Sequence, residues 1–254
     1  IDNPVLFDKP TANDEFNNSD LAKKHDVRIG DVPSGKLLYS PRVGFRWFVD
    51  KEHQVLLRGG AGLFTGRVPF VWISNNFSNN GIEQVSIKSY DQDKNPVLGQ
   101  HITGEDVKNK GFKASSSTIN VVDKDFKYPQ VFRVNLATDI DFGAGWQATL
   151  EALYSKSLND LYVRNIGYEP TGAHFTAVPG VPASSAPIYQ KVTSYSDVIH
   201  MTNTSKGYTY SVTAQLKKTF PWGLSVDAAY TFGHSYTMFD GTSSVAYSNW
   251  KYNY

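Results

Sequence analysis

The chain has 254 residues, no cysteine, and a formal net charge of +1 from 25 basic and 24 acidic residues. These figures exclude a disulfide framework and a thiolate metal site, and the absence of a basic stripe argues against a nucleic-acid partner. Aromatic residues reach 14% at a mean hydropathy of -0.38, which excludes a helical membrane protein but leaves a β-barrel open, because barrel strands carry only alternate apolar residues.

The first predicted hairpin consists of strands near residues 43–50 and 54–64. Apolar residues recur at every second position of its first strand, at Val43, Phe45 and Trp47. A period of two is typical of a strand with one apolar face. We expect residues 1–42, which precede this hairpin, and residues 236–254 at the other end of the chain to form parts of outer loops.

The second predicted hairpin consists of strands near 131–142 and 145–164. Phe132, Val134 and Leu136 alternate with polar residues such as Arg133. Only the segment 143–145, with the sequence Gly-Ala-Gly, separates the two strands, which predicts a tight turn. A third hairpin follows the same pattern, with strands near 207–219 and 222–235.

Short and long connections alternate along the chain. The turns inside the three hairpins are a few residues long, whereas 65–129 and 165–206 are long, polar and without a helical period. Outer-membrane barrels have short periplasmic turns and long extracellular loops. The prediction is an all-β fold of antiparallel up-and-down hairpins, a sector of a transmembrane β-barrel with long extracellular loops.

The strand faces favour the same interpretation. Rings near the short turns, such as Trp47 and Trp146, and rings nearer the long loops, such as Tyr154 and Tyr230, suit the two aromatic girdles of a barrel in lipid. A soluble β-sandwich shows the same period of two. The alternative is therefore a secreted β-sandwich that binds or adheres at the cell surface.

One outer loop is the candidate ligand site. Arg67, Phe70, Trp72, Asn76 and Phe77 lie close together in sequence, and rings beside amides and a guanidinium suit stacking and hydrogen bonding to a sugar or peptide. The alternative is a loop whose aromatic residues pack on the loop itself.

We predict no enzyme activity, no cofactor and no metal site. The acidic segment that begins at Asp91 opens like a calcium loop, but Pro96 and Ile102 stand where that loop needs glycine and glutamate. The six histidines are scattered, and no nucleophile elbow, phosphate-binding loop or dinucleotide fingerprint occurs.

Four segments carry a family resemblance, at residues 40–47, 57–72, 128–136 and 158–162. Their sequences resemble the barrel of TonB-dependent receptors of the Bacteroidetes type, in the subgroup with a carboxypeptidase-regulatory-like domain. The resemblance implies a plugged barrel of about 22 strands in the cell outer membrane, which takes up a bulky nutrient such as a glycan, peptide or metal chelate. The implied partners are outer-membrane lipid, a plug domain, TonB and a surface lipoprotein.

The chain departs from the complete pattern of that family. It shows no plug domain, no TonB box and no leader before Ile1, and six strands cannot close a barrel of that size. We therefore expect residues 1–254 to be an internal piece of the barrel domain.

Overall fold

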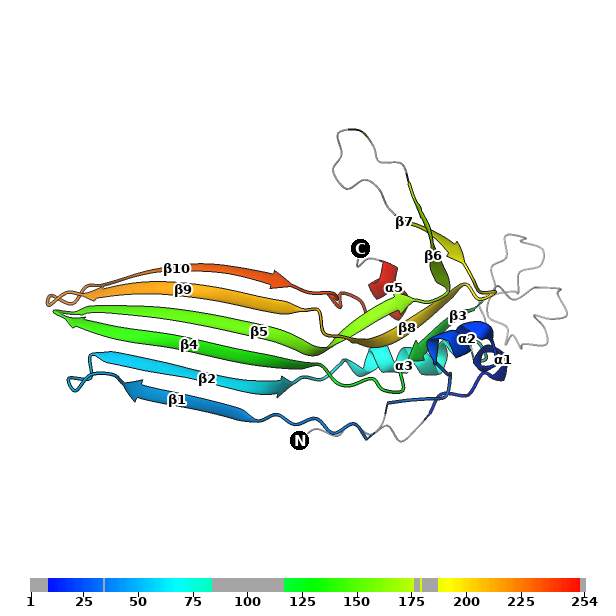
Figure 1. The fold of residues 1–254 in the computed structure, drawn as a ribbon, viewed down its shortest axis with the longest axis horizontal. Coiled ribbons are helices and arrows are strands. Elements are labelled where there is room, and N and C mark those ends of the chain that lie inside the picture. Colours follow the sequence, from blue (N-terminus) through cyan, green and yellow to red (C-terminus); the bar gives the residue numbers. More distant parts are fainter. Residues whose placement is uncertain (1–8, 34, 84–116, 176–178, 180–186, 252–254) are drawn as a thin grey trace, which may run out of the picture.

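The computed structural model describes residues 9–33, 35–83, 117–175, 179 and 187–251. Six long strands form one antiparallel sheet in the order β1-β2-β4-β5-β9-β10 (Figure 1). Their bounds are Arg42–Phe48 for β1, Val55–Thr65 for β2, Gln130–Gly143 for β4, Trp146–Asn165 for β5, Tyr208–Thr219 for β9 and Ser225–Tyr236 for β10. The predicted class, all-β with antiparallel hairpins, is confirmed. No helix within the described ranges has the length and apolar character to cross a membrane.

Three short turns lie at one end of this sheet (Figure 1). In the β1–β2 turn the Asp50 carboxylate accepts hydrogen bonds from the backbone N–H groups of Gln54 at 2.8 Å and Val55 at 2.7 Å. These bonds lower the pKa of Asp50. In the β4–β5 turn Gly145 has φ +79°, and a Cβ there would lie 2.2 Å from the carbonyl oxygen of Thr219. Glycine is therefore required at this position.

The opposite end of the sheet carries a small folded unit, which we call the cap. It is built from the end of β5 and from α1 (Asp14–Asn17), α2 (Asp20–His25), α3 (Phe70–Ser78), β3 (Thr118–Val122), β8 (Asp197–Thr204) and α5 (Ala246–Lys251). A separate hairpin of β6 (Tyr168–His174) and β7 (Pro187–Lys191) projects beside it (Figure 1).

The segments outside the hairpins, which the sequence predicts to be loops, contain short helices and strands. Residues 1–42 contain α1 and α2, 65–129 contain α3 and β3, 165–206 contain β6, β7 and β8, and 236–254 contain α5. The helices have only four to nine residues. Helices this short are stabilised by tertiary packing, so they leave little periodic signal in the sequence.

The cap is layered around a three-stranded sheet, in which β8 pairs antiparallel with β5 and parallel with β3. Its two faces bury separate hydrophobic clusters. The first cluster packs α1 and α2 against one face, with Phe16 and Val198 fully buried. The second packs α3 and α5 against the other face, around Phe126 and Ile199. The alternation of Val198 and Ile199 between the clusters is the normal alternation of a strand.

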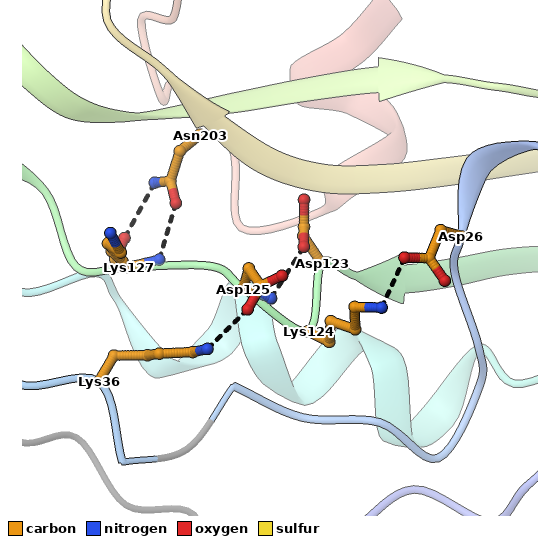
Figure 2. Close-up of polar contacts among 7 residues, drawn as sticks. All are labelled: Asp26, Lys36, Asp123, Lys124, Asp125, Lys127 and Asn203. Carbon is orange, nitrogen blue, oxygen red and sulfur yellow. Dashed lines mark hydrogen bonds and ion pairs between the residues drawn. The ribbon is translucent and has the colours of Figure 1, made fainter.

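The segment after β3, residues 123–127, is joined by two ion pairs to the chain that follows α2. Lys124 donates to Asp26 at 2.5 Å, and Lys36 donates to Asp125 at 2.6 Å (Figure 2). The side chains of Asp26, Lys124 and Asp125 are exposed and that of Lys36 is partly buried, so each pair contributes little stability on its own.

The same segment is also held to β8 by amide contacts. Asn203 accepts from the backbone N–H of Lys127 at 2.7 Å and donates to the carbonyl of that residue at 2.9 Å (Figure 2). Thr202 donates to the carboxylate of Asp123 at 2.9 Å. These contacts fix the backbone on either side of Phe126, whose ring is 1% exposed.

Candidate functional site

The long sheet has one apolar face. Cross-strand rows on this face run through β2, β4, β5, β9 and β10, for example Gly59, Leu136, Ala152, Val212 and Phe232. The apolar side chains are exposed, with Val212 at 44% and Phe232 at 58%. A contiguous exposed apolar surface of this kind is unstable in water and suits contact with another apolar phase.

The opposite face of the same strands is polar. Arg58 donates through Nε to Asp139 at 2.8 Å and lies 3.6 Å from Glu151. Thr149 donates to the same aspartate at 2.7 Å. Further along this face Gln215 donates to Asp227 at 2.7 Å. These residues come from β2, β4, β5, β9 and β10, so the polar face is continuous across five strands.

Aromatic rings lie at both ends of the apolar face, although Tyr230, predicted near the long loops, lies opposite Ala214 at the middle of the face. Trp146 and Tyr154 lie eight residues apart on β5, a distance of about 26 Å along a strand at about 3.3 Å per residue. At a strand tilt of about 40° this becomes about 20 Å. The rings therefore bracket an apolar band of nearly the height, about 25 Å, that a barrel presents to lipid.

The β-sandwich alternative does not fit this sheet. A sandwich buries the apolar face beneath a second sheet. In the part of the chain that the structure describes, no sheet covers this face, and Leu150 is 52% exposed. Moreover, β1 pairs only with β2, and β10 only with β9, among the described strands.

The five predicted ligand residues lie on α3 or just before it, but their environments differ. Phe70 is 60% exposed and Arg67 is also exposed. Trp72 packs edge to face on Phe239, with the ring centroids 5.4 Å apart, and donates from Nε1 to the carbonyl of Ser243 at 2.7 Å. The Trp72 side chain therefore helps to attach the segment before α5 to α3.

The other two predicted residues face the interior of the cap. Asn76 is 5% exposed and donates to the carbonyl of Ile73 at 2.7 Å. Phe77 is partly buried against the second cluster. The structure thus brings Trp72, Asn76 and Phe77 into the packing of the cap, and leaves Phe70 and Arg67 at its surface.

A pocket that the sequence did not indicate lies between the β6–β7 hairpin and α5. It has a volume of about 300 Å³ and is lined by Asn165, Tyr168, Tyr189 and Trp250. The rings of Tyr168 and Trp250 are nearly parallel, at 15°, with centroids 6.3 Å apart. Parallel rings beside an open apolar pocket can stack on a planar or sugar ring.

Two histidines lie on the α2 side of the cap, His200 buried and His25 partly buried. His200 is 2% exposed, and its Nδ1 accepts a hydrogen bond from Arg164 at 3.2 Å. Burial, assisted by the charge of Arg164, lowers the pKa of His200 to about 4. His25 is affected in the same way, since burial and then Arg164 lower its pKa. His200 is therefore neutral at pH 7.

We expect the cap to lose stability as the pH falls from 6.5 to 4. In the unfolded chain His200 takes up a proton near pH 6.5, whereas in the fold it does so only near pH 4. The contribution of neutral His200 to the free energy of unfolding of the cap is fully present above pH 6.5, and it declines by about 3 kcal/mol by pH 4. Hydrogen exchange of the β3 and β8 amides across this range measures the effect.

The control for this experiment is His200→Gln, which keeps an acceptor for Arg164 but does not titrate. Its cap should show a clearly weaker dependence on pH between 6.5 and 4, with the remainder due to groups such as His25. Equal pH dependence in the two proteins would contradict the assignment to His200.

The described residues contain no group of three or more His, Cys, Asp or Glu side chains placed to hold a metal ion. The acidic segment that begins at Asp91 lies outside the described residues.

Comparison with known proteins gives a family and a set of similar folds. The family model described as "Outer membrane beta barrel domain" matches residues 10–254. No curated protein matches the sequence. Among solved structures, the fold is similar to a mutant of the ferric enterobactin receptor PfeA of Pseudomonas aeruginosa, at 13% identity and a TM-score of 0.42 over 76% of this chain and 21% of that one.

Two further structures are similar at the same level. They are the siderophore receptors PirA of Pseudomonas aeruginosa and of Acinetobacter baumannii, each at 11% identity, with TM-scores of 0.38 and 0.41. The matches cover 77% and 84% of this chain, and 28% and 24% of those receptors. The chain thus spans less than a third of the length of each of these three receptors.

Proposed function

Because the chain belongs to the outer-membrane β-barrel domain family, we propose that it forms part of the wall and outer surface of a receptor that takes up a bulky nutrient, a glycan, peptide or metal chelate. The observation that carries the proposal is the division of one sheet into an exposed apolar face and a continuous polar face. Lipid requires the first face, and a wet lumen suits the second.

The two ends of the sheet support a particular orientation of the chain in the outer membrane. Short turns at one end and a folded cap at the other match the periplasmic and extracellular ends of outer-membrane barrels. The outer edges of β1 and β10, each without a described partner strand, would pair with further strands to close the barrel, since open edges are not tolerated in lipid. In this proposal the chain is an internal sector of a larger barrel.

The partners of the proposed receptor follow from the resemblance of the sequence to Bacteroidetes TonB-dependent receptors of the carboxypeptidase-regulatory-like-domain subgroup. A plug domain would fill the lumen against the polar face, TonB would supply energy, and a lipoprotein would meet the cap. The ligand would contact the exposed Phe70 and Arg67, with Trp72, Asn76 and Phe77 holding α3 in place. The pocket beside Tyr168 is a second place for a ring to stack.

Cysteine labelling tests the orientation. The chain contains no cysteine, so each introduced thiol is unique within it. In the full-length protein on intact cells, Phe70→Cys in the cap should react with a membrane-impermeant maleimide. Lys51→Cys in the β1–β2 turn should react only after the outer membrane is permeabilised. Labelling of both variants on intact cells would overturn the proposed crossing of the membrane.

Uptake tests the transport function. Cells that carry the full-length protein should accumulate at least one of three labelled probes, namely maltoheptaose, an oligopeptide and ferric citrate, and a protonophore should stop the accumulation. For that probe Phe70→Ala should weaken binding by about tenfold, because exposed aromatic anchors dominate binding energies. Ser74→Ala, one helical turn further along α3, should leave it unchanged. Accumulation equal to that of cells lacking the protein, for all three probes, would refute uptake of these nutrient classes.

A further inference from the structure

We propose that the lumen wall carries a binding site for a carboxylate group, formed by Arg42 and Arg133 on either side of Gly62. The inference rests on the proposed function only in assigning the polar face of the sheet to the lumen. It adds the chemistry of a ligand for a part of the wall near the cap end of β1 and β2, whose lining shares no residue with α3 or with the pocket beside Tyr168.

Strand register brings the two arginines together. Arg42 on β1 lies opposite Gly62 on β2, and Gly62 lies opposite Arg133 on β4. The three residues form one row, so both arginines project from the same face. Strands lie about 4.8 Å apart, which places the two Cα atoms about 10 Å apart with a glycine between them. The long side chains can converge above this bare stretch of backbone.

An aromatic ring marks the place where they converge. The guanidinium carbon of Arg42 lies 4.3 Å from the centroid of the Phe64 ring, and that of Arg133 lies 5.7 Å from it. Both distances are within the range of cation–π attraction. The ring therefore holds two positive charges near one another, although the charges repel.

The two arginines lack the neutralising partners that a nearby arginine has. Arg58, on the same strand as Gly62 and on the same face, is paired with Asp139 and Glu151. Within the described ranges, neither Arg42 nor Arg133 forms an ion pair with a carboxylate. Arg58 is thus neutralised by carboxylates, whereas Arg42 and Arg133, nearer the cap, are available for an anion.

A cavity of about 210 Å³ lies between these groups. Arg42, Phe64, Arg133, Asn135 and Leu153 line it, and Gly60 and Gly62 form its floor. A Cβ on Gly62 would lie 2.9 Å from Cγ of Arg42, and a Cβ on Gly60 would lie 2.8 Å from the carbonyl oxygen of Val43. Side chains at either glycine would displace the wall, so the floor stays open.

The lining selects a small anionic group with an apolar body. Arginine presents a planar fork of donors that matches a carboxylate in bidentate geometry, and the Asn135 amide can add a further donor. Phe64 and Leu153 supply apolar contact for the carbon skeleton. The carboxylate could come from a nutrient in transit or from an acidic side chain of the plug, since both carry the same chemistry.

The experiment uses 4-fluorobenzoate as the probe and neutral 4-fluorobenzamide as its isosteric control, with binding to the purified full-length protein followed by fluorine NMR. We expect the benzoate to bind and the benzamide not to bind. Arg42→Gln and Arg133→Gln should each weaken benzoate binding by about tenfold or more. Arg46→Gln, which removes the same charge from the same face of β1, should leave it unchanged.

The second arm separates the two sources of the carboxylate. If the benzoate does not bind, a double variant, Arg42→Gln with Arg133→Gln, should release the plug to limited proteolysis more readily than Arg46→Gln does, which would assign the site to the plug. If the benzoate does not bind and the double variant behaves like Arg46→Gln, the proposal is overturned. Neither arm depends on uptake, so failure of the nutrient assay leaves this test intact.

Discussion

Arginine in place of Ala214 is expected to destabilise the full-length protein by about 2–4 kcal/mol. Ala214 lies on the apolar face of β9, in register with Leu150 on β5 and Tyr230 on β10. It sits midway between Lys218 and Tyr210, which lie near the two ends of the apolar band. A charge at this depth would face the centre of the hydrocarbon. Urea unfolding of the protein in lipid vesicles measures the loss.

The adjacent residue on the same strand provides the control. Thr213 points to the polar face and lies opposite Glu151, so Thr213→Arg would place its charge in the lumen beside a carboxylate. We expect a change within about 0.5 kcal/mol, as for surface substitutions in general. Similar losses in the two variants would show that the two faces do not meet different solvents.

Removal of the Phe126 ring is expected to destabilise the cap by about 3–5 kcal/mol. The ring is 1% exposed and lies at the centre of the second hydrophobic cluster, among residues of α3, β5, β8 and α5. Phe126→Ala leaves a cavity that its neighbours cannot fill, because their backbones are held in sheets and helices. Hydrogen exchange of the β3 and β8 amides in the full-length protein measures the effect.

The long sheet should be much less affected by Phe126→Ala, because proteins can open locally without unfolding as a whole. Lys127→Ala is the matched control: the side chain is exposed, and the contacts of this residue with Asn203 are made by its backbone. We expect Lys127→Ala to change the free energy of opening of the cap, as measured by hydrogen exchange, by about 0.5 kcal/mol or less. Equal exchange in the two variants would mean that the second cluster does not hold the cap together.

The sequence carries local signals for two helices of the cap, although both helices are too short to show a long helical period. Asn13 accepts from the N–H of Phe16 at 3.0 Å, and Ser19 accepts from that of Ala22 at 3.2 Å. Both are helix N-caps of the preferred residue types. Capping residues of this kind, followed by acidic residues and then apolar ones, were a detectable sign of α1 and α2.

The candidate ligand loop shows why a site is harder to predict than a strand. Rings and amides within a few residues suggested a binding surface, but the amide of Asn76 is used by the backbone of its own helix and the Trp72 ring packs on Phe239. Whether a side chain points to solvent depends on what packs against the helix. For α3 the packing partners come from β3, β5, β8 and α5, which are distant in sequence.

The proximity of the two luminal arginines also depends on the tertiary structure. Arg42 and Arg133 are 91 positions apart in the sequence, and nothing local relates them. They meet because β2 pairs with β1 on one side and β4 on the other, with Gly62 in the shared row.

By itself the sequence determined the strands of the long sheet, their apolar and polar faces, and the end that carries the short turns. These properties are local, because side chains alternate along any strand and tight turns depend on a few residues of the backbone. Only the tertiary structure decided that the long connections fold into a cap, since its clusters join Phe16 to Ile119 and Val68 to Met201. Such contacts form between segments that are far apart in sequence, and short helices gain their stability from them.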